Sequence, residues 1–428
     1  MTSNEKPSSI DVSGSLNAVR LEGKIGNVKK VIHLYIDFMQ INHRNYKKCQ
    51  SFTAPSIVQH IIKNIKKTEI NKDITYDLFG SVSPVELNYT SCDQLFQYPD
   101  KVSIFFNDNI IFDVIRNKTL PSRIFPNTRF HYNAIFHIYD DVIKLMESIK
   151  SNIRDSIYNI KIGKEKNYEV IDDMINIAKS KMAYEYKLLK TSDLVKDKNA
   201  KRFIPEFIED LSLYTIEENT KAKKLLISKI KNNYNHSKIK DVVNGMIDTY
   251  AVENVKNILL LLNDISIWNN DLKNYFKVFY ENRGKLLKLY DDYYNYGNLD
   301  EWKVFKRPVV EITMLNIKIA FNSIKGILRE RHGAMLKSLE TIRRILDKDY
   351  ITNAFFYAPD TSSIYTLHTL VDKFDFKITH ISINKLGTIE KLEDFIRNNK
   401  DPYQLMKYIY PNNFYQCVNL KNFPKYFM

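Results

Sequence analysis

A long helical pattern between residues 308 and 348 is the feature that most constrains the fold of this 428-residue chain. Apolar side chains recur there at three- and four-residue steps, which places them on one side of a helix. They are Ile312, Leu315, Ile319, Ile324, Ile327, Leu328, Leu336, Leu339, Ile342 and Leu346. Pro308 fits the first turn, because that turn does not use the N–H that proline lacks. Gly326 and Gly333 each weaken a helix by about 1 kcal/mol relative to alanine, so we expect them to mark a break or bend.

A second apolar stripe predicts the centre of an all-helical domain at residues 161–349. Its members are Val243, Ile247, Ala251, Val255, Ile258, Leu262 and Ile265. Residues 259–262 make the helix apolar all round at that point. A helix of this kind is expected to be buried among other helices.

The N-terminal part alternates strand and helix patterns. Residues 31–38 form a nearly continuous apolar run, which is typical of a strand buried on both faces. Thr53 and Pro55 then mark the start of a helix, and further short apolar runs follow. This alternation predicts an α/β domain at residues 29–160, preceded by a disordered polar tail at residues 1–28.

The C-terminal part reads as strand, helix, strand and helix, at residues 354–357, 361–374, 377–383 and 389–398. This order predicts two neighbouring parallel strands joined by a right-handed crossover. The segment at residues 350–428 is either a separate module or the completion of the N-terminal sheet. The predicted fold class is therefore mixed α/β, mainly α, with an α/β N-terminal domain, an all-helical middle and a βαβα C-terminal module.

The formal net charge of +14 does not by itself predict a nucleic-acid-binding protein. Lys, Asn, Ile, Tyr and Phe are abundant, whereas Gly (11) and Pro (12) are scarce for this length, and an AT-rich gene encodes such a composition. In composition and length the chain resembles proteins of AT-rich mobile genomes, namely large cytoplasmic DNA viruses and the linear killer plasmids of yeasts. The killer-plasmid resemblance implies an alternative function, that of a toxin-immunity or antagonist factor acting by protein binding.

The three cysteines, Cys49, Cys92 and Cys417, lie at scattered spacings without a Cys-x-x-Cys pair. This pattern predicts reduced core residues in an intracellular protein. The N-terminus lacks the apolar segment of a signal peptide, and no apolar run approaches the length of about 20 residues that a bilayer requires. We therefore expect a cytoplasmic protein that does not engage a membrane.

Lysines cluster at residues 221–240, which we call the basic segment, with no acidic residue among them. Tyr234 and His236 lie in a polar break within it. An aromatic ring among lysines can stack on an exposed base, so the segment is the candidate nucleic-acid site; the alternative is a solvated helix face. The candidate cations are Lys221, Lys223, Lys224, Lys229, Lys231, Lys238 and Lys240.

Two further groups are candidates for sites. Aromatic residues concentrate at Tyr290, Tyr293, Tyr294, Tyr296 and Trp302, and such residues favour protein contacts or pack an interhelical connection.

Asp37 ends the first buried strand, and Asp140 with Asp141 follows a later apolar run. These three carboxylates could bind Mg²⁺ in a nuclease or phosphatase, or they could simply end strands and begin a helix.

The predicted function is that of a non-enzymatic intracellular binding protein, which engages RNA or a protein partner through the basic segment. No cofactor fingerprint or nucleophile motif is present in the sequence, so no cofactor is expected. The sequence leaves the oligomeric state open.

Overall fold

Strands and helices divide between two units in this computed structural model, which describes residues 11–37, 49, 54–68, 75–80, 111–113, 118–120, 125–132, 140–161, 169–190, 224, 227–228, 230–281, 307–412 and 416–424. The sheet unit comprises Met1–His137, Asp193–Gly245 and Gly333–Met428. The helical unit comprises Ile138–Ser192 and Met246–His332. The predicted fold class, mixed α/β and mainly α, is confirmed, but the units interleave along the chain instead of following one another.

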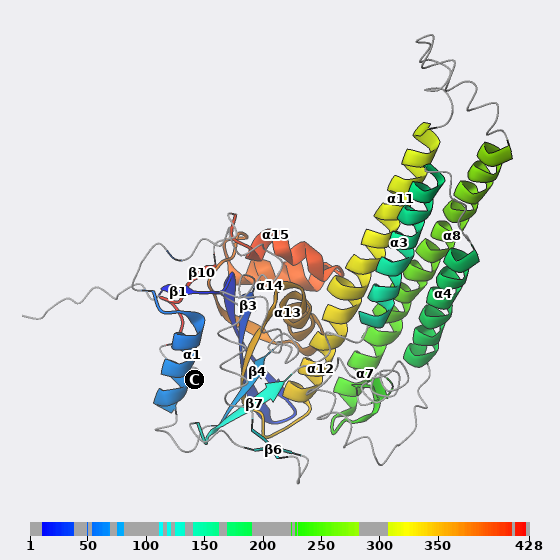
Figure 1. The fold of residues 1–428 in the computed structure, drawn as a ribbon. Helices are drawn as coiled ribbons and strands as arrows, with labels where there is room; N and C mark the ends of the chain where they lie inside the picture. The colour runs from blue at the N-terminus through cyan, green and yellow to red at the C-terminus, as the bar shows by residue number, and fades with distance from the viewer. Residues whose placement is uncertain are drawn as a thin grey trace, which may run out of the picture. The chain divides into compact units, whose positions relative to one another are not determined.

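A six-stranded sheet forms the centre of the sheet unit (Figure 1). In spatial order its strands are β7 (Thr128–Tyr132), β4 (Tyr76–Gly80), β8 (Asn353–Pro359), β3 (Val28–Asp37), β2 (Asn17–Ile25) and β9 (Lys377–Ile381). The first four run parallel, and β2 is antiparallel to both of its neighbours. A separate two-stranded pair joins β5 (Ile111–Asp113) to β6 (Lys118–Leu120).

The prediction of a disordered polar tail at residues 1–28 is wrong from residue 11 onward. β1 (Asp11–Ser13) and β2 lie within it, and β2 forms a hairpin with β3. Gly26 makes the tight turn of this hairpin with a φ of +56°, a conformation that glycine adopts without steric cost. Val19 and Leu21 point to one face of the sheet and are fully buried, so this nine-residue strand contributes to the core.

The C-terminal strands complete the N-terminal sheet, which is one of the two arrangements that the sequence allowed. β8 lies between β3 and β4, and β9 lies at the far edge beside β2. The expectation that β8 and β9 are neighbours is therefore wrong, because two strands separate them. α13 (Asp360–Phe374) connects them, and α14 (Ile389–Asn398), η6 (Pro402–Leu405), α15 (Met406–Ile409) and β10 (Cys417–Asn419) follow.

Helix α1 (Ile57–Thr68) covers part of one face of the sheet. Ser56 and Gln59 begin it with a reciprocal capping box, in which each side chain accepts from the other residue's backbone N–H. Ile57, Ile61 and Ile65 then recur at four-residue steps and join the core cluster of the sheet. This agrees with the helix predicted after Thr53 and Pro55.

Four helices form the core of the helical unit (Figure 1): α3 (Asp140–Lys161), α4 (Glu169–Lys190), α8 (Val252–Glu281) and α11 (Arg307–Gly326). Contacts join α3 to α4, α4 to α8, α8 to α11 and α11 back to α3. α7 (Ser237–Met246) and the π-helical η4 (Ile247–Ala251) lead into α8, and the predicted apolar stripe along them is buried throughout. The prediction that this helix is buried on all sides is wrong, because Leu260 of α8 is 62% exposed.

The long pattern at residues 308–348 forms α11, the π-helical η5 (Ile327–Gly333) and α12 (Ala334–Leu346). The change of helix type at η5 coincides with the break expected from Gly326 and Gly333. α12 is buried on nearly all sides, including Lys337 and Arg343. The prediction that all these apolar positions fall on one face is wrong, because Ile312, Leu315 and Ile319 are exposed while Ile324 and Leu328 are buried.

A buried lysine closes the C-terminal end of α12. Lys30, fully buried on β3, donates from Nζ to the carbonyl oxygens of Ile345 (2.9 Å), Lys348 (2.9 Å) and Ile351 (2.7 Å). Helix C-termini leave carbonyl groups without intrahelical donors, and a cation there also favours the helix dipole. Burial lowers the pKa of Lys30 to about 8, so the ammonium form still predominates at pH 7.

We expect Lys30→Met to lower the free energy of unfolding by about 2 kcal/mol, because three buried carbonyl groups lose a charged donor while the apolar stem is kept. Urea unfolding followed by circular dichroism measures the change. Lys29→Met is the matched control, since Lys29 is exposed and pairs with Glu22 at the surface. Equal effects of the two substitutions would contradict the assigned role of Lys30.

Among the described residues, no helix is both long and apolar enough to cross a membrane.

Candidate functional site

Asp37 lies at the carboxyl end of β3, as the sequence indicated. Its carboxylate is buried, accepting from the Tyr357 hydroxyl at 2.6 Å and from the Gln416 side-chain amide at 2.8 Å. Asp140 and Asp141 begin α3 in the helical unit, and the apolar run before them lies outside the described residues. The described residues contain no group of three or more His, Cys, Asp or Glu side chains that could hold a metal ion. A Mg²⁺ site therefore stays a prediction without support from these contacts.

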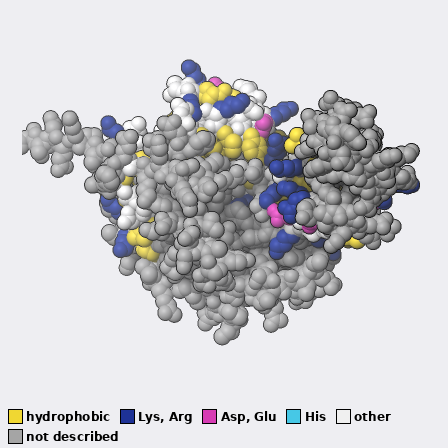
Figure 2. Space-filling view, turned by 45° about the horizontal axis from the view of Figure 1, so that its top comes forward, with side chains coloured by type: hydrophobic (Ala, Val, Ile, Leu, Met, Phe, Trp, Pro, Cys, Tyr) yellow, Lys and Arg dark blue, Asp and Glu magenta, His cyan; other side chains and the backbone are white. Residues whose placement is uncertain are grey.

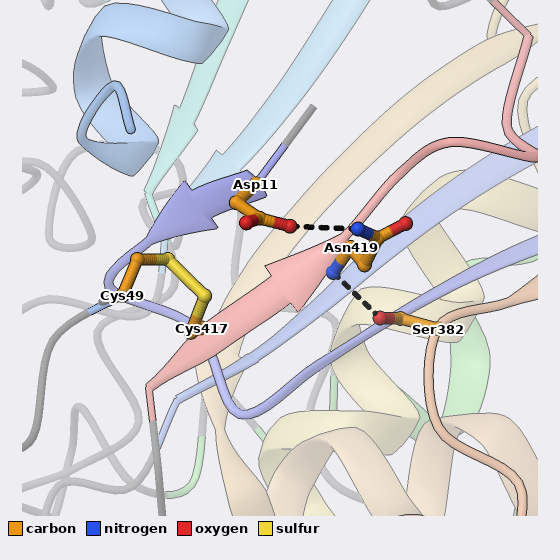
Figure 3. Close-up of a disulfide and its surroundings, with 5 residues drawn as sticks. All are labelled: Asp11, Cys49, Ser382, Cys417 and Asn419. Atoms are coloured by element: carbon orange, nitrogen blue, oxygen red, sulfur yellow. Dashed lines mark hydrogen bonds between the residues drawn. A yellow bond between two sulfur atoms is a disulfide. The ribbon is translucent and has the colours of Figure 1, made fainter. Parts of the chain in front are cut away.

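The hydrogen bond from Gln416 to Asp37 is one of several contacts that fasten the C-terminal segment to the sheet unit. Cys417 forms a disulfide with Cys49 (Figure 3), with 4.9 Å between the Cα atoms, so the prediction of reduced cysteines is wrong for this pair. β10 pairs antiparallel with β1, and the Asn419 side chain donates to Asp11 at 2.7 Å. The two cysteines are 368 positions apart, and their spacing held no signal of the pairing. Cys92 lies outside the described residues.

Several described residues of the basic segment make internal contacts. Lys231 is buried, the Tyr234 hydroxyl donates to the Ile230 carbonyl, and His236 Nε2 lies 2.9 Å from Asp349. Burial also raises the pKa of Tyr234. Of the other candidate cations, Lys224 is half-buried, Lys238 and Lys240 are exposed, and Lys221, Lys223 and Lys229 lie outside the described residues.

The polar break of the basic segment is attached to the end of α12. Asp347 Oδ1 accepts from the backbone N–H groups of Asn235 (2.7 Å) and His236 (2.9 Å), immediately before α7 begins. Arg343 donates to the Asn233 carbonyl at 3.2 Å and pairs with Glu340 through two nitrogens. The residues expected to stack on a base therefore have a structural role within the sheet unit.

A charged network that the sequence analysis missed lies on one face of the sheet. Asp77, fully buried on β4, accepts two 2.6 Å hydrogen bonds from Arg129 and lies 2.6 Å from His131 Nε2. Arg344 of α12 lies 2.7 Å from His131 Nδ1, and Phe79 stacks on the His131 ring. Arg344 can only donate, so His131 accepts at Nδ1 and donates from Nε2 to Asp77.

The electrostatics of this network favour a stable ion pair over reactive chemistry. Burial raises the pKa of Asp77, but the hydrogen bonds from Arg129 and His131 outweigh burial and lower the pKa below its ordinary value. Burial, assisted by Arg344, lowers the pKa of His131 to about 4. Every polar atom named here has a partner, which indicates that the network attaches α12 to the sheet. A carboxylate inside the apolar run at residues 76–79 was the signal in the sequence.

Exposed aliphatic side chains concentrate on the helical unit. Leu260 and Ile267, which we call the α8 row, are 62% and 58% exposed. Ile312, Leu315 and Ile319, the α11 row, are between 53% and 58% exposed. Val170 and Ile177 are exposed on α4. The predicted aromatic contact residues, Tyr290, Tyr293, Tyr294, Tyr296 and Trp302, lie outside the described residues.

Positive charge is spread over the described surface instead of forming one patch on the face seen in Figure 2. Lys and Arg side chains occur there at several separate places, with hydrophobic side chains among them. This distribution agrees with an overall lysine bias in the composition.

Comparison with known proteins gives relatives from a giant virus. The chain is 27% identical to the uncharacterized protein R706 of Acanthamoeba polyphaga mimivirus and 28% identical to R161 of the same virus, and each alignment covers 98% of both chains. R160 is 25% identical over 97% of both chains. These relatives confirm the resemblance to large DNA virus proteins and give no support to a killer-plasmid or toxin-immunity protein.

No solved structure matches the chain. A family model described as a family of unknown function, DUF5847, matches residues 10–428, which is nearly the whole chain. The chain therefore belongs to the DUF5847 family.

Proposed function

We propose that this chain is a non-enzymatic binding protein of a large DNA virus, which contacts a protein partner through the helical unit. The observation that carries the proposal is the spacing of the exposed aliphatic residues. Single exposed aliphatic side chains are ordinary on protein surfaces, whereas aligned ones indicate a contact surface. The α8 row and the α11 row each contain residues seven positions apart, which lie almost in line along a helix.

The two rows are distinct from the core of the helical unit. One residue turns a helix by about 100°, so positions two apart point to opposite sides. Leu260 is two positions from both Ile258 and Leu262, which are fully buried. Ile319 likewise lies two positions from Ile317 and from Phe321, which are both buried. α8 and α11 therefore each have one apolar side within the unit and another on its surface, as helices that bind a partner helix do.

RNA binding through the basic segment is the second proposal. Lys238 and Lys240 favour it, because they are exposed at the first turn of α7 and are free to approach a phosphate backbone. The internal contacts of Lys231, Tyr234 and His236 leave fewer groups for this role than the sequence alone suggested. We rank protein binding first for that reason.

A pull-down of the tagged chain from cells that produce it separates the two proposals. We expect nuclease-resistant partners that are lost when Leu260→Asp and Ile319→Asp are combined, because two charges then replace the centre of the apolar surface. Ser148→Asp is the control, since Ser148 is exposed on α3, which has contacts with α4 and α11. Partners that survive the double substitution contradict the protein-binding proposal. Partners released by nuclease favour the basic segment.

A further inference from the structure

Two continuous helices connect the two units, and each changes to π-helix where it crosses from one unit to the other. α7, η4 and α8 follow one another without a break from the sheet unit into the helical unit, and α11, η5 and α12 lead back. The units divide between Gly245 and Met246 and between His332 and Gly333. We propose that η4 and η5 together form a hinge, at which the helical unit reorients relative to the sheet unit.

The π-helical segments are the places where these two helices bend most easily. A π-helix is rare, its hydrogen bonds join residues five positions apart, and a π turn is one of the few causes of a sharp helix kink. Among the described residues, π-helix occurs only in η4 and η5. Met246 and Val252, on either side of η4, keep helical φ and ψ, so η4 is a change of helix type and not a loop. The other two crossings, at residues 137–138 and 192–193, lie outside the described residues.

Glycine occurs in the described helices only beside or within these two segments. Gly245 lies two positions before η4, Gly326 directly precedes η5, and Gly333 ends η5. Neither Gly245 nor Gly326 has a positive φ. A Cβ atom placed on either would meet nothing within 4 Å apart from the backbone of its own helix. No steric reason therefore requires glycine at these positions, and its effect there is to make departure from a straight helix less costly.

The two helices are held as a pair on each side of the proposed hinge. In the sheet unit, Asp347 accepts from the backbone N–H groups of Asn235 and His236, which joins the end of α12 to the start of α7. In the helical unit, α8 and α11 are neighbours. Bending of one helix therefore requires bending of the other, which confines the motion to η4 and η5.

Double electron–electron resonance between spin labels on the two units of the full chain tests the inference. The labels are attached through a ketone-bearing amino acid at Ser148 of α3 and at Lys391 of α14, which are both exposed, so the cysteines are not used. We expect a broad distribution of distances for the original chain and a narrower one when Gly245→Ala and Gly326→Ala are combined. Each alanine should lower the ratio of bent to straight helix about fivefold, which corresponds to about 1 kcal/mol.

Asn263→Ala combined with Asn322→Ala is the matched control, because these asparagines are exposed on α8 and α11 outside the π-helical segments. The control should leave the distribution broad. Amide hydrogen exchange gives a second measurement, in which η4 and η5 should exchange faster than the centre of α8 and should be slowed by the two glycine substitutions.

A single narrow distance in the original chain overturns the inference. A broad distribution that the glycine substitutions do not narrow overturns it too, as does one that the control narrows equally. Binding of a partner is not part of this experiment, so its failure leaves the proposed function unaffected.

Discussion

The free energy of unfolding should fall steeply between pH 6.5 and pH 4, because the sheet unit holds one buried histidine and two partly buried ones that are neutral in the folded state. Burial, with the nearby Arg20, lowers the pKa of His33 on β3 to about 3. Burial also lowers the pKa of His60 and of His131 to about 4, assisted by Lys63 and Arg344 respectively. The ordinary histidine pKa is 6.5, so the unfolded chain binds protons that these folded side chains exclude.

The sign follows from the direction of these shifts. A group whose pKa is lower in the folded state contributes stability that is fully present above its unfolded pKa and is lost as the pH falls toward the folded value. At pH 5, each of the three histidines therefore lowers the free energy of unfolding by about 1 to 2 kcal/mol relative to its value at pH 8. Together they cost about 3 to 6 kcal/mol, a large part of the stability of an ordinary domain. The Asp77 carboxylate acts in a lower pH range. Its pKa is lowered in the folded state, so the stability that it contributes is lost only as the pH falls below its ordinary pKa of 3.8.

Urea unfolding at pH values from 8 to 4.5, followed by circular dichroism, measures this slope. His60→Gln removes one titrating ring and can still hydrogen-bond to the Tyr35 hydroxyl, which lies 3.1 Å from His60 Nε2. We expect that substitution to reduce the slope by about one third. A free energy of unfolding that stays constant from pH 7.5 to pH 5 would contradict the assignment of these rings as neutral in the folded state.

Local elements of the fold could be predicted from the sequence because their signals are local. The predicted helix at residues 389–398 agrees with α14, where the Thr388 side chain accepts from the Lys391 backbone N–H and caps the first turn. The predicted strand at residues 354–357 lies within β8. Strand neighbours depend on contacts between distant segments instead, and an apolar run does not specify its partner. The position of β8 between β3 and β4 therefore could not be predicted from local sequence patterns.

The exposed rows show a different limit of periodicity. Steps of three and four residues describe either side of a helix, so Ile312, Leu315 and Ile319 fit the pattern as well as Ile317 and Phe321 do. Only the neighbouring helices decide which set is buried, and they bury the second set. For the charged network, a carboxylate inside an apolar run was a usable signal, as with Asp77, whereas Lys30 directly precedes the apolar run at residues 31–38. The Cys49–Cys417 disulfide, which joins cysteines 368 positions apart, had no such signal in the sequence.

Removal of the Cys49–Cys417 disulfide should lower the free energy of unfolding by about 3 to 5 kcal/mol. A crosslink restricts the unfolded chain, and the restriction grows with the length of the loop that it closes, here 368 positions. In the folded state the link holds β10 beside β1, with Val418 and Leu420 in the core cluster and Gln416 on the buried Asp37. The disulfide thus acts together with strand pairing, core packing and the Gln416 hydrogen bond to hold the C-terminal segment.

The comparison is between the original chain and the double variant Cys49→Ser, Cys417→Ser, with Cys92→Ser as the control that removes a thiol but keeps the crosslink. We expect the double variant and the dithiothreitol-treated original chain to share one melting temperature, which is lower than that of the untreated original chain. Dithiothreitol should not change the melting temperature of the double variant. Alkylation of the unreduced chain reports which of the three cysteines are free thiols. Modification of Cys92 with protection of Cys49 and Cys417 supports the crosslink. Three alkylated cysteines in protein purified without reductant would show that the bond does not form and that the cysteines are reduced, as the sequence analysis expected.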